Sequence, residues 1–479
     1  MRKTKIVATL GPATDDPDVL RRMIAAGLDV ARFNFSHGEH ADHRAKVESI
    51  RKACAETGAT VALLADTKGP EIRLGVFKDG KTKLVAGNAF TLTSDDIEGD
   101  STGASISYAD LPREVSPGTR ILLDDGLIEL VTESVSGTKI NTRVNIGGPI
   151  SSRKGVNVPG VSLDIPYISA KDRSDIRFFV ENGFDIIAAS FVRSANDIRE
   201  MREELHRVDS GNKIKIIAKI ENADGVRNAD SILTACDGIM VARGDLGVEV
   251  AYEDLPIIQK DLIVRGVSQG KPVITATQML ESMISNPRPT RAETSDVANA
   301  IYDGTSAIML SGETAVGKYP VEAIATMAKI AERIERDIDY RQRFQQSEFH
   351  AESSITNAIS HATVTTSHDL RTAAILTVSM SGNTARNVAK FRPICPIIAC
   401  TPDPVVQRQL KLVWGVEPLL TVTESSTADV FNRAVEAALN AGYIKTGDLV
   451  VLTAGIPLGF SGTTNMLKVH VVGESILES

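Results

Sequence analysis

Short apolar runs alternate with amphipathic stretches along most of the chain. The runs are rich in Val, Ile, Leu and Ala, and the stretches between them have apolar residues at helical spacing and often end at Gly. This alternation predicts parallel βαβ units. Eight such units, with strands apolar on both faces, favour a closed (β/α)8 barrel over an open sheet. The predicted barrel strands are 6–10, 30–35, 61–66, 186–191, 214–220, 238–241, 273–276 and 307–310, and the predicted helices include 17–26, 40–56, 198–208, 257–267 and 291–302.

One interval interrupts this rhythm, because well over a hundred residues separate the third run from the fourth. A loop of that length without structure of its own is uncommon. The interval is rich in Gly turns and short β-like runs, so residues 70–166 are predicted to form an inserted all-β lid domain on the C-terminal rim of the barrel. Its predicted strands are 82–85, 89–93, 120–123, 128–131 and 139–144.

A second α/β pattern follows the eighth run. A single long helix is predicted from Val321 to about Phe344, and strands are predicted at 373–378, 396–400, 416–420, 449–453 and 466–472. The fold class is therefore α/β. The predicted domains are a barrel (1–69 and 167–345), the inserted lid (70–166) and a C-terminal α/β regulatory domain (346–479).

Composition narrows the class of protein. The chain has 479 residues, is 42% apolar and 24% charged, and carries a formal charge of -8. These values describe a soluble globular protein of about three domains and argue against nucleic acid or an anionic membrane as the partner. No apolar run reaches the length of about 18 residues that a spanning helix needs. The four cysteines form no CxxC pair, so free thiols and a cytoplasmic location are predicted.

Polar residues gather where the predicted barrel strands end. In a barrel this rim carries the chemistry, because the packed interior rejects polar groups. The carboxylates of Glu221 and Asp245 are suited to Mg²⁺. The strand-end positives Arg32 and Lys219, together with Arg73 just beyond the third strand, are suited to phosphate oxygens. A second oxygen cluster with one formal charge, suited to a monovalent cation, comprises Asn34, Ser36, Asp66 and Thr67. These groups together indicate phosphoryl transfer, which needs positioning and charge neutralisation more than covalent help.

Eight segments in this order resemble the pyruvate kinase family. They are residues 4–12, 31–38, 66–73, 219–222, 240–247, 276–283, 287–293 and 309–314. The C-terminal domain matches as well, so the resemblance covers nearly the whole chain. It implies transfer of a phosphoryl group from phosphoenolpyruvate to ADP by a cytoplasmic homotetramer of the bacterial type, without an additional C-terminal extension.

The resemblance also implies roles for individual residues. Lys219 would stabilise the charge leaving the phosphoryl group, and Gly244, Asp245 and Thr277 would contact the substrate, with Thr277 on the route that protonates the enolpyruvate carbon. Glu71 matches the K⁺-dependent members, which favours a K⁺ requirement. By motif position, Glu221 and Asp245 would hold Mg²⁺ or Mn²⁺, Asn34, Ser36, Asp66 and Thr67 would hold K⁺, and Arg32, Arg73 and Lys154 would bind the transferring phosphate and the ADP phosphates.

Two rival functions remain open at this point. A barrel lyase or aldolase would use Lys219 as a Schiff base, although the nearby Glu221 and Asp245 favour metal chemistry over an imine. A catalytically silent protein could instead bind metabolites and respond through its C-terminal domain, although no position of the active-site motifs is lost.

The C-terminal domain contains a candidate effector loop at Ser379, Ser381, Gly382, Asn383 and Thr384. Hydroxyls and backbone N–H groups at a helix start can bind a phosphate, such as that of a phosphorylated effector. The alternative is simple helix capping by Ser381 or Thr384. Residues 455–464 would form the facing loop. Thr423 and Val430 stand where animal enzymes that bind fructose 1,6-bisphosphate have Trp and Arg, so the effector could be that sugar, a monophosphate or a nucleotide.

Two further patterns have simpler interpretations. Residues 312–319 nearly match a phosphate-binding loop, but Tyr319 stands where Ser or Thr must contact Mg²⁺. His37, His40 and His43 invite a zinc interpretation, yet no fourth ligand is evident and a solvated helix start explains them.

Overall fold

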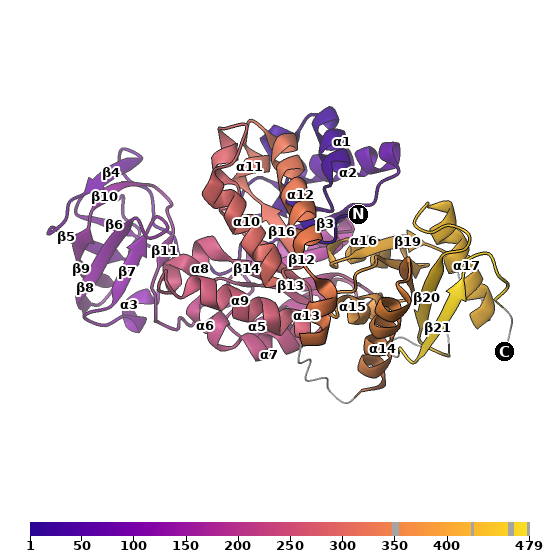
Figure 1. Ribbon diagram of the computed structural model, residues 1–479. Coiled ribbons are helices and arrows are strands. Elements are labelled where there is room, and N and C mark those ends of the chain that lie inside the picture. Colours follow the sequence, from indigo (N-terminus) through magenta and orange to yellow (C-terminus); the bar gives the residue numbers. More distant parts are fainter. Residues whose placement is uncertain (347–353, 423–425, 458–463, 477–479) are drawn as a thin grey trace.

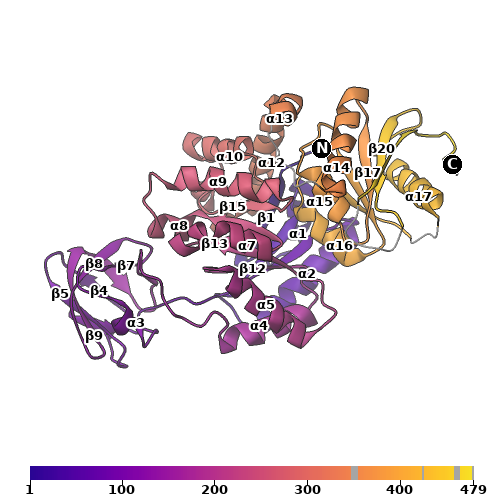
Figure 2. The ribbon, with the colours of Figure 1, turned by 90° about the horizontal axis from the view of Figure 1, so that it is seen from below.

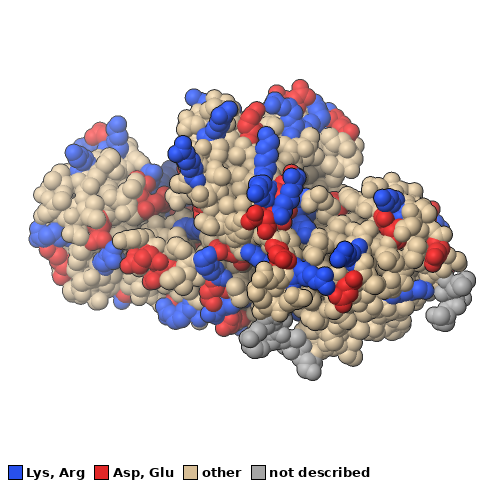
Figure 3. Space-filling model, viewed as in Figure 1, with Lys and Arg blue, Asp and Glu red and all other residues tan. Residues whose placement is uncertain are grey.

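The computed structural model describes residues 1–346, 354–422, 426–457 and 464–476. A central barrel separates two other domains (Figure 1). An all-β domain lies on one side of the barrel and an α/β domain on the other, and the view from below shows the same arrangement (Figure 2). On the face shown in Figure 3, cationic and anionic side chains are interspersed over all three domains, and the surface is notched between the β domain and the barrel.

The barrel is closed by eight parallel strands, which confirms the predicted fold class. Their spatial order is β1-β16-β15-β14-β13-β12-β3-β2. Most residues of each strand are apolar and buried, as expected for strands covered on both faces. The strands are β1 (Lys5–Thr9), β2 (Val30–Asn34), β3 (Ala62–Asp66), β12 (Ile186–Ala189), β13 (Lys215–Ile220), β14 (Gly238–Ala242), β15 (Val273–Ala276) and β16 (Ala307–Leu310).

Helices form the outer ring of the barrel. Several begin with a capping box, in which the first polar side chain and the residue three positions later satisfy each other's backbone N–H groups, as at Ser169, Ser194 and Thr290. The barrel helices are α1 (Pro17–Ala26), α2 (His40–Thr57), α4 (Ala170–Glu181), α5 (Ala195–Val208), α6 (Ala223–Arg227), α7 (Ala229–Ala235), α8 (Arg243–Glu249), α9 (Leu255–Ser268), α10 (Arg291–Asp303), α11 (Gly312–Ala315) and α12 (Pro320–Asp337).

An inserted β domain lies between β3 and α4 in the chain. It has its own apolar core, which includes Phe77, Phe90, Ile121 and Leu130. The limits at residues 70 and 166 stay predictions. The elements of this domain are β4 (Lys81–Leu84), β5 (Ala89–Thr93), β6 (Gly103–Ser105), α3 (Leu111–Glu114), β7 (Arg120–Leu123), β8 (Ile128–Ser136), β9 (Lys139–Ile146), β10 (Gly148–Ser151) and β11 (Val156–Asn157).

The C-terminal domain is a five-stranded sheet with helices on its faces. The order is β19-β18-β17-β20-β21, and only β21 runs antiparallel to its neighbour. Its elements are α14 (Ile355–Leu370), β17 (Ala374–Val378), α15 (Asn383–Ala389), β18 (Ile397–Thr401), α16 (Pro404–Gln409), β19 (Val416–Leu420), α17 (Thr427–Asn440), β20 (Leu449–Ala454) and β21 (Met466–Val471).

The prediction of one long helix from Val321 to about Phe344 is wrong. Helix α12 ends at Asp337, and a separate helix, α13, spans Tyr340–Gln346. Ile338 between them has an extended backbone, and the Asp339 carboxylate accepts a hydrogen bond from Gln342 N at 2.9 Å. Apolar residues continue at helical spacing past Asp337, so the sequence pattern did not reveal that the Asp339 side chain caps the start of a second helix.

A buried charged cluster joins the barrel to the C-terminal domain. Asp29, the residue before β2, pairs with Arg2 at 2.6 Å and with Lys411 at 3.2 Å. Lys411 also pairs with Glu417 at 3.1 Å, and Lys5 donates to Val416 O at 2.7 Å. The cationic partners hold the pKa of Asp29 well below its usual range although burial alone would raise it. The two domains therefore share an ionic core at their seam.

The helices of the described ranges include none with the length and apolarity to cross a bilayer. The four cysteines are free thiols, as predicted.

Candidate active site

Lys219 is the centre of the candidate site. It is the penultimate residue of β13, and its side chain is 11% exposed. The ammonium lies 3.0 Å from Asp66 Oδ1 and 2.8 Å from Glu221 Oε1, and it donates to Ser190 Oγ at 2.8 Å. Burial alone would lower the pKa of Lys219, but the two carboxylates raise it above its usual value. The amine is therefore a fixed, fully protonated cation.

Arg32 lies on the other side of Asp66. Its Nε donates to Asp66 Oδ2 at 2.6 Å and its Nη1 donates to Thr9 Oγ1 at 2.8 Å. Burial favours the neutral form of Asp66, but Arg32 and Lys219 together hold its pKa below the usual value. The sequence therefore correctly placed Arg32 and Lys219 at one rim, and the structure adds that one buried carboxylate lies between them.

Glu221, which is buried, and Asp245, which is half-buried, form a carboxylate pair beside Lys219. Burial raises the pKa of both side chains, and the Asp245 charge raises that of Glu221 further, while Lys219 opposes the shift. Two neighbouring anions that repel each other are stabilised by a cation between them, so this pair fits a divalent metal. Among the described residues no group of three or more His, Cys, Asp and Glu side chains is placed to hold a metal ion. A metal on this pair would therefore take its remaining ligands from water or substrate.

The predicted monovalent-cation residues also lie together. Asn34 pairs in register with Asp66 across β2 and β3, and Thr67 follows directly. Ser36 lies in the turn after β2, where its backbone N–H donates to Asn34 Oδ1 at 3.1 Å. Asp66 is the one charged oxygen donor among three neutral ones, which suits a singly charged ion.

Thr277 and Gly244 meet at the ends of β15 and β14. Gly244 N donates to Thr277 Oγ1 at 2.8 Å. Thr277 has a φ of 73°, which is rare for a β-branched residue and marks local strain. Arg243 stabilises this backbone, because it donates to Ala276 O at 3.3 Å and to Thr277 O at 2.5 Å. Arg243 is itself held by Asp296 at 2.7 Å.

Arg73 and Lys154 form a separate group at the root of the inserted β domain. Arg73 Nε donates to Glu71 Oε2 at 2.8 Å, and Lys154 pairs with Asp124 at 2.8 Å. The two residues are neighbours, since Leu74 N donates to Lys154 O at 2.8 Å. The structure thus divides the predicted phosphate-binding residues into a barrel set and a set on the inserted domain.

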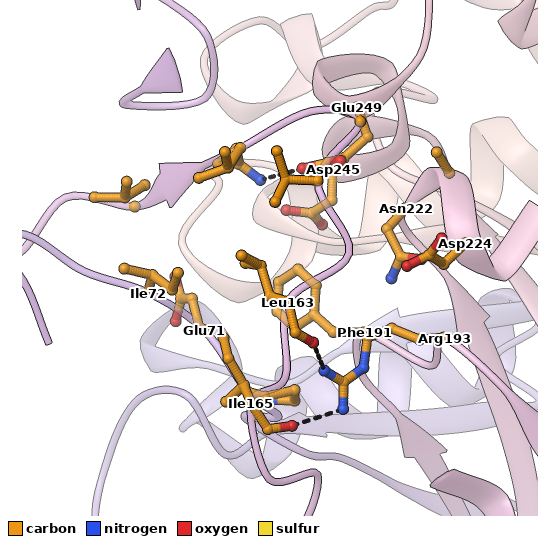
Figure 4. Close-up of a pocket in the computed structure, with 18 of the residues that line it drawn as sticks. Glu71, Ile72, Leu163, Ile165, Phe191, Arg193, Asn222, Asp224, Asp245 and Glu249 are labelled. Atoms are coloured by element: carbon orange, nitrogen blue, oxygen red, sulfur yellow. Dashed lines mark hydrogen bonds between the residues drawn. The ribbon is translucent and has the colours of Figure 1, made fainter. Parts of the chain in front are cut away.

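A cavity of about 110 Å³ lies between the inserted β domain and the barrel (Figure 4). Its wall on the inserted domain includes Glu71 and Ile72, and its wall on the barrel includes Asp245 and Glu249. Arg193 reaches across from the barrel and donates to Leu163 O and Ile165 O, both at 2.7 Å. The candidate metal ligand Asp245 lines the cavity, so the cavity is continuous with the candidate site at the barrel rim.

The predicted effector loop leads into α15. Gly382 is the N-terminal cap with a φ of 75°, and within the described part of the chain no side chain caps this helix, so capping by Ser381 or Thr384 is not observed. Instead, Arg386 donates to Ser381 O at 2.7 Å and to Asn383 Oδ1 at 2.6 Å, while Thr384 Oγ1 accepts from Thr464 Oγ1 at 3.0 Å. Ser379 N donates to Cys400 O at 3.1 Å. Of the predicted facing loop, residues 458–463 lie outside the described residues, as does Thr423.

The zinc and phosphate-loop patterns have structural explanations. His40 pairs with Asp175 at 2.7 Å, and His43 stacks on Phe35 at 4.0 Å between ring centroids. In the 312–319 segment, Gly317 packs against the backbone of Glu313, and Tyr319 is the N-terminal cap of α12.

Two residues of the site, Ser190 and Thr9, were not predicted from the sequence. Ser190 follows β12 and contacts Asp66, Thr67 and Lys219, with bonds of 3.0 Å to Asp66 Oδ1 and 2.7 Å to Thr67 O. Thr9 ends β1 and accepts from Arg32. Both are polar residues at strand ends, so the rule that selected the other candidates would have found them had it been applied to the first and fourth strands.

The chain is similar to known proteins over nearly its whole length. The family model described as pyruvate kinase, barrel domain, matches residues 1–324, and the model described as pyruvate kinase, alpha/beta domain, matches residues 357–470. A pyruvate kinase of Clostridium acetobutylicum is 47% identical over 98% of this chain and 100% of its own length. One from Geobacillus stearothermophilus is 50% identical over 99% of this chain and 81% of its own length.

A solved structure shows the same architecture. The crystal structure of a pyruvate kinase from Cryptosporidium parvum matches with a TM-score of 0.93 at 39% identity, over 98% of this chain and 96% of that one. The barrel model alone covers well over half of the chain, and the relatives match at nearly full length. The chain belongs to the pyruvate kinase family of enzymes.

Proposed function

We propose that the protein transfers the phosphoryl group of phosphoenolpyruvate to ADP and so produces pyruvate and ATP. One observation carries this proposal: the Lys219 ammonium is fixed by Asp66, Glu221 and Ser190, and Glu221 forms a carboxylate pair with Asp245. A site of this kind presents fixed positive charge to an anionic group and leaves room for a divalent metal. Phosphoryl transfer is the reaction that needs this combination most.

Glu221 and Asp245 are the residues that would hold Mg²⁺ or Mn²⁺, and Asn34, Ser36, Asp66 and Thr67 are those that would hold K⁺. When bound, the cations neutralise and orient the phosphoryl and carboxylate oxygens of the substrate. The K⁺ requirement is tested by comparing turnover in K⁺ buffer with turnover in buffer that contains only Na⁺. An equal rate in both would contradict it.

The chain's own residues supply the remaining steps. Lys219 would stabilise the charge that develops on the transferring group, and Arg32 would bind its oxygens from the other side of Asp66. Thr277, held by Gly244 and Arg243, would deliver the proton to the enolpyruvate carbon, through a water molecule. Arg73 and Lys154 would bind the ADP phosphates from the inserted β domain.

The Schiff-base alternative is disfavoured by the protonation of Lys219. A lysine that attacks a carbonyl must be neutral, and such lysines have a lowered pKa. The carboxylates around Lys219 instead raise its pKa. Borohydride trapping with a carbonyl substrate would reveal an imine, and we expect no labelling.

The C-terminal domain is proposed to bind a phosphorylated effector at Ser379, Ser381, Gly382, Asn383 and Thr384. Support comes from the N-terminus of α15, which no side chain of the described residues caps. The homotetramer and the cytoplasmic location stay predictions from the family. A thermal-shift panel of fructose 1,6-bisphosphate, sugar monophosphates and AMP tests the effector, and no shift with any of them would contradict it.

The decisive experiment for the function is an assay of pyruvate release coupled to lactate dehydrogenase. It contains phosphoenolpyruvate, ADP, Mg²⁺ and K⁺. Turnover that requires both substrates would support the proposed reaction. Binding of phosphoenolpyruvate without turnover would instead support a catalytically silent metabolite-binding protein.

A further inference from the structure

Two of the proposed K⁺ ligands lie at the turn between β2 and α2, and a residue of helix α4 contacts the backbone of this turn. Asn34 ends β2 and Ser36 lies in the turn, with Phe35 between them. Lys171 in the first turn of α4 donates to Phe35 O at 3.1 Å. The carbonyl that links the two ligands is therefore fixed by a residue more than a hundred positions away in the chain.

Lys171 is fixed in turn by a buried carboxylate. Asp175, one helical turn further along α4, has a side chain that is 1% exposed. Its Oδ2 lies 2.6 Å from Lys171 Nζ, and its Oδ1 lies 2.7 Å from His40 Nε2 at the start of α2. A buried carboxylate is costly without partners, so it orders both of these side chains. Because Asp175 cancels the charge of Lys171, the pair holds the turn without repelling a cation.

Aromatic packing holds the other side of the same turn. Phe35 is buried at 1% exposure and packs edge-on against Phe179 at 4.6 Å between centroids. His43 stacks on Phe35 and its Nε2 donates to His37 O at 2.9 Å. Hydrogen bonds therefore fix the backbone on both sides of Ser36: Lys171 donates to Phe35 O, and His43 donates to His37 O.

We propose that Lys171, oriented by Asp175, is a positioning residue for the monovalent-cation site and sets its preference for K⁺ over Na⁺. The spacing of the Asn34 and Ser36 oxygens depends on the Phe35 peptide, and a site that cannot contract around the smaller ion favours the larger one. This inference rests on the proposed function, because it assigns K⁺ to Asn34, Ser36, Asp66 and Thr67.

The test compares Lys171→Met with Lys171→Arg and with a control, Lys46→Met. Lys46 lies in α2 and pairs with the exposed Asp15, away from the turn. K⁺ activation is measured at saturating phosphoenolpyruvate, ADP and Mg²⁺. In Lys171→Met the half-saturating K⁺ concentration should rise by about tenfold, the loss typical when a partner behind a metal ligand is removed. The kcat at saturating K⁺ should stay within about twofold, which a general loss of structure would not permit.

Substrate-free binding provides a second readout. The gain in melting temperature on adding K⁺, relative to equal Na⁺, should shrink in Lys171→Met and return largely in Lys171→Arg, while Lys46→Met should match the wild type. Because Lys171→Met leaves Asp175 with one partner, the double variant Lys171→Met/Asp175→Asn keeps the pocket neutral and should show the same change if the single variant folds poorly.

The possible outcomes distinguish failure of the proposed K⁺ site from failure of the Lys171 role. A wild type whose activity and melting temperature are indifferent to K⁺ overturns the proposed cation site and this inference with it. A wild type that responds to K⁺, together with Lys171 variants that keep its half-saturating concentration and its Na⁺ discrimination, overturns the positioning role alone.

Discussion

Replacement of Lys219 by Met tests the proposed chemistry most directly. The substitution keeps the length of the buried stem and removes the ammonium that contacts Asp66, Glu221 and Ser190 at 2.8 to 3.0 Å. A unit charge at about 3 Å, with an effective dielectric constant of about 20, contributes about 5 to 6 kcal/mol. Part of that interaction is already present with the bound substrate, so about 3 to 4 kcal/mol should be specific to the transition state. The expected fall in kcat is therefore about two to three decades.

Divalent-metal binding should survive the same substitution. Lys219 is a positive charge beside Glu221, so its removal eliminates repulsion of a divalent cation. Titration of Mn²⁺ by electron paramagnetic resonance at pH 8 should give an affinity equal to or above that of the wild type. Loss of turnover with retained metal binding would separate the charge of Lys219 from assembly of the metal site.

Lys215→Met is the matched control, since Lys215 begins the same strand at the opposite end of the barrel and pairs with Asp237 at 3.2 Å. It should keep nearly wild-type turnover in the coupled assay. If Lys219→Met retained more than a tenth of the wild-type kcat, the assignment of transition-state charge to Lys219 would be refuted.

Three further substitutions probe the surroundings of the site and the seam. Ser190→Ala removes bonds to Asp66, Thr67 and Lys219, a loss of about 1 to 3 kcal/mol; kcat should fall about tenfold with the far-ultraviolet circular dichroism unchanged, and an unchanged kcat would contradict the role. Gly69→Ala places a Cβ 2.9 Å from Ser190 O at a φ of 67°, so thermal melting should show a loss of at least about 1 kcal/mol and the assay a lower kcat; wild-type values in both would argue against this close approach. Asp29→Asn should destabilise the protein by about 3 to 5 kcal/mol at pH 7 in urea unfolding. Folding depresses the pKa of Asp29, so the wild type has this extra stability above the unfolded-state pKa of about 4 and loses it as the pH falls further. The difference in unfolding free energy between the two proteins should therefore narrow at pH 3 to 4. A difference that stays constant with pH would contradict a stabilising role for the charge of Asp29.

The sequence predicted the framework of the site because strand ends in a barrel obey a simple rule. Apolar runs located the eight strands, and the polar residues that follow them, such as Arg32 and Asp245, had to converge at one rim. The pattern of apolar and polar residues did not predict the contacts between those side chains. That Asp66 lies between Arg32 and Lys219 depends on the order of strands around the barrel and on the rotamers of two long side chains.

Local signals failed where two patterns overlapped. The apolar period of α12 continues past Asp337, so the break at Ile338 was invisible without the hydrogen bond to Asp339. Lys171 lies on an outer helix of the barrel, and nothing in its neighbourhood in the sequence points to Phe35. A contact between one helix and a distant turn depends on tertiary packing, and the spacing of apolar residues in a single sequence does not predict it.

The two bonds of Arg193 to the linker after the inserted β domain have a mechanical consequence. They fix the carbonyls of Leu163 and Ile165 to the barrel rim (Figure 4). Just beyond, Tyr167 OH donates to Ser190 O at 3.1 Å. At the other linker, Gly69 packs closely against Ser190. Both linkers of the inserted β domain therefore contact Ser190, through Tyr167 and Gly69, and Ser190 also binds Lys219. A substitution in either linker is expected to act on the position of the Lys219 ammonium through that one residue.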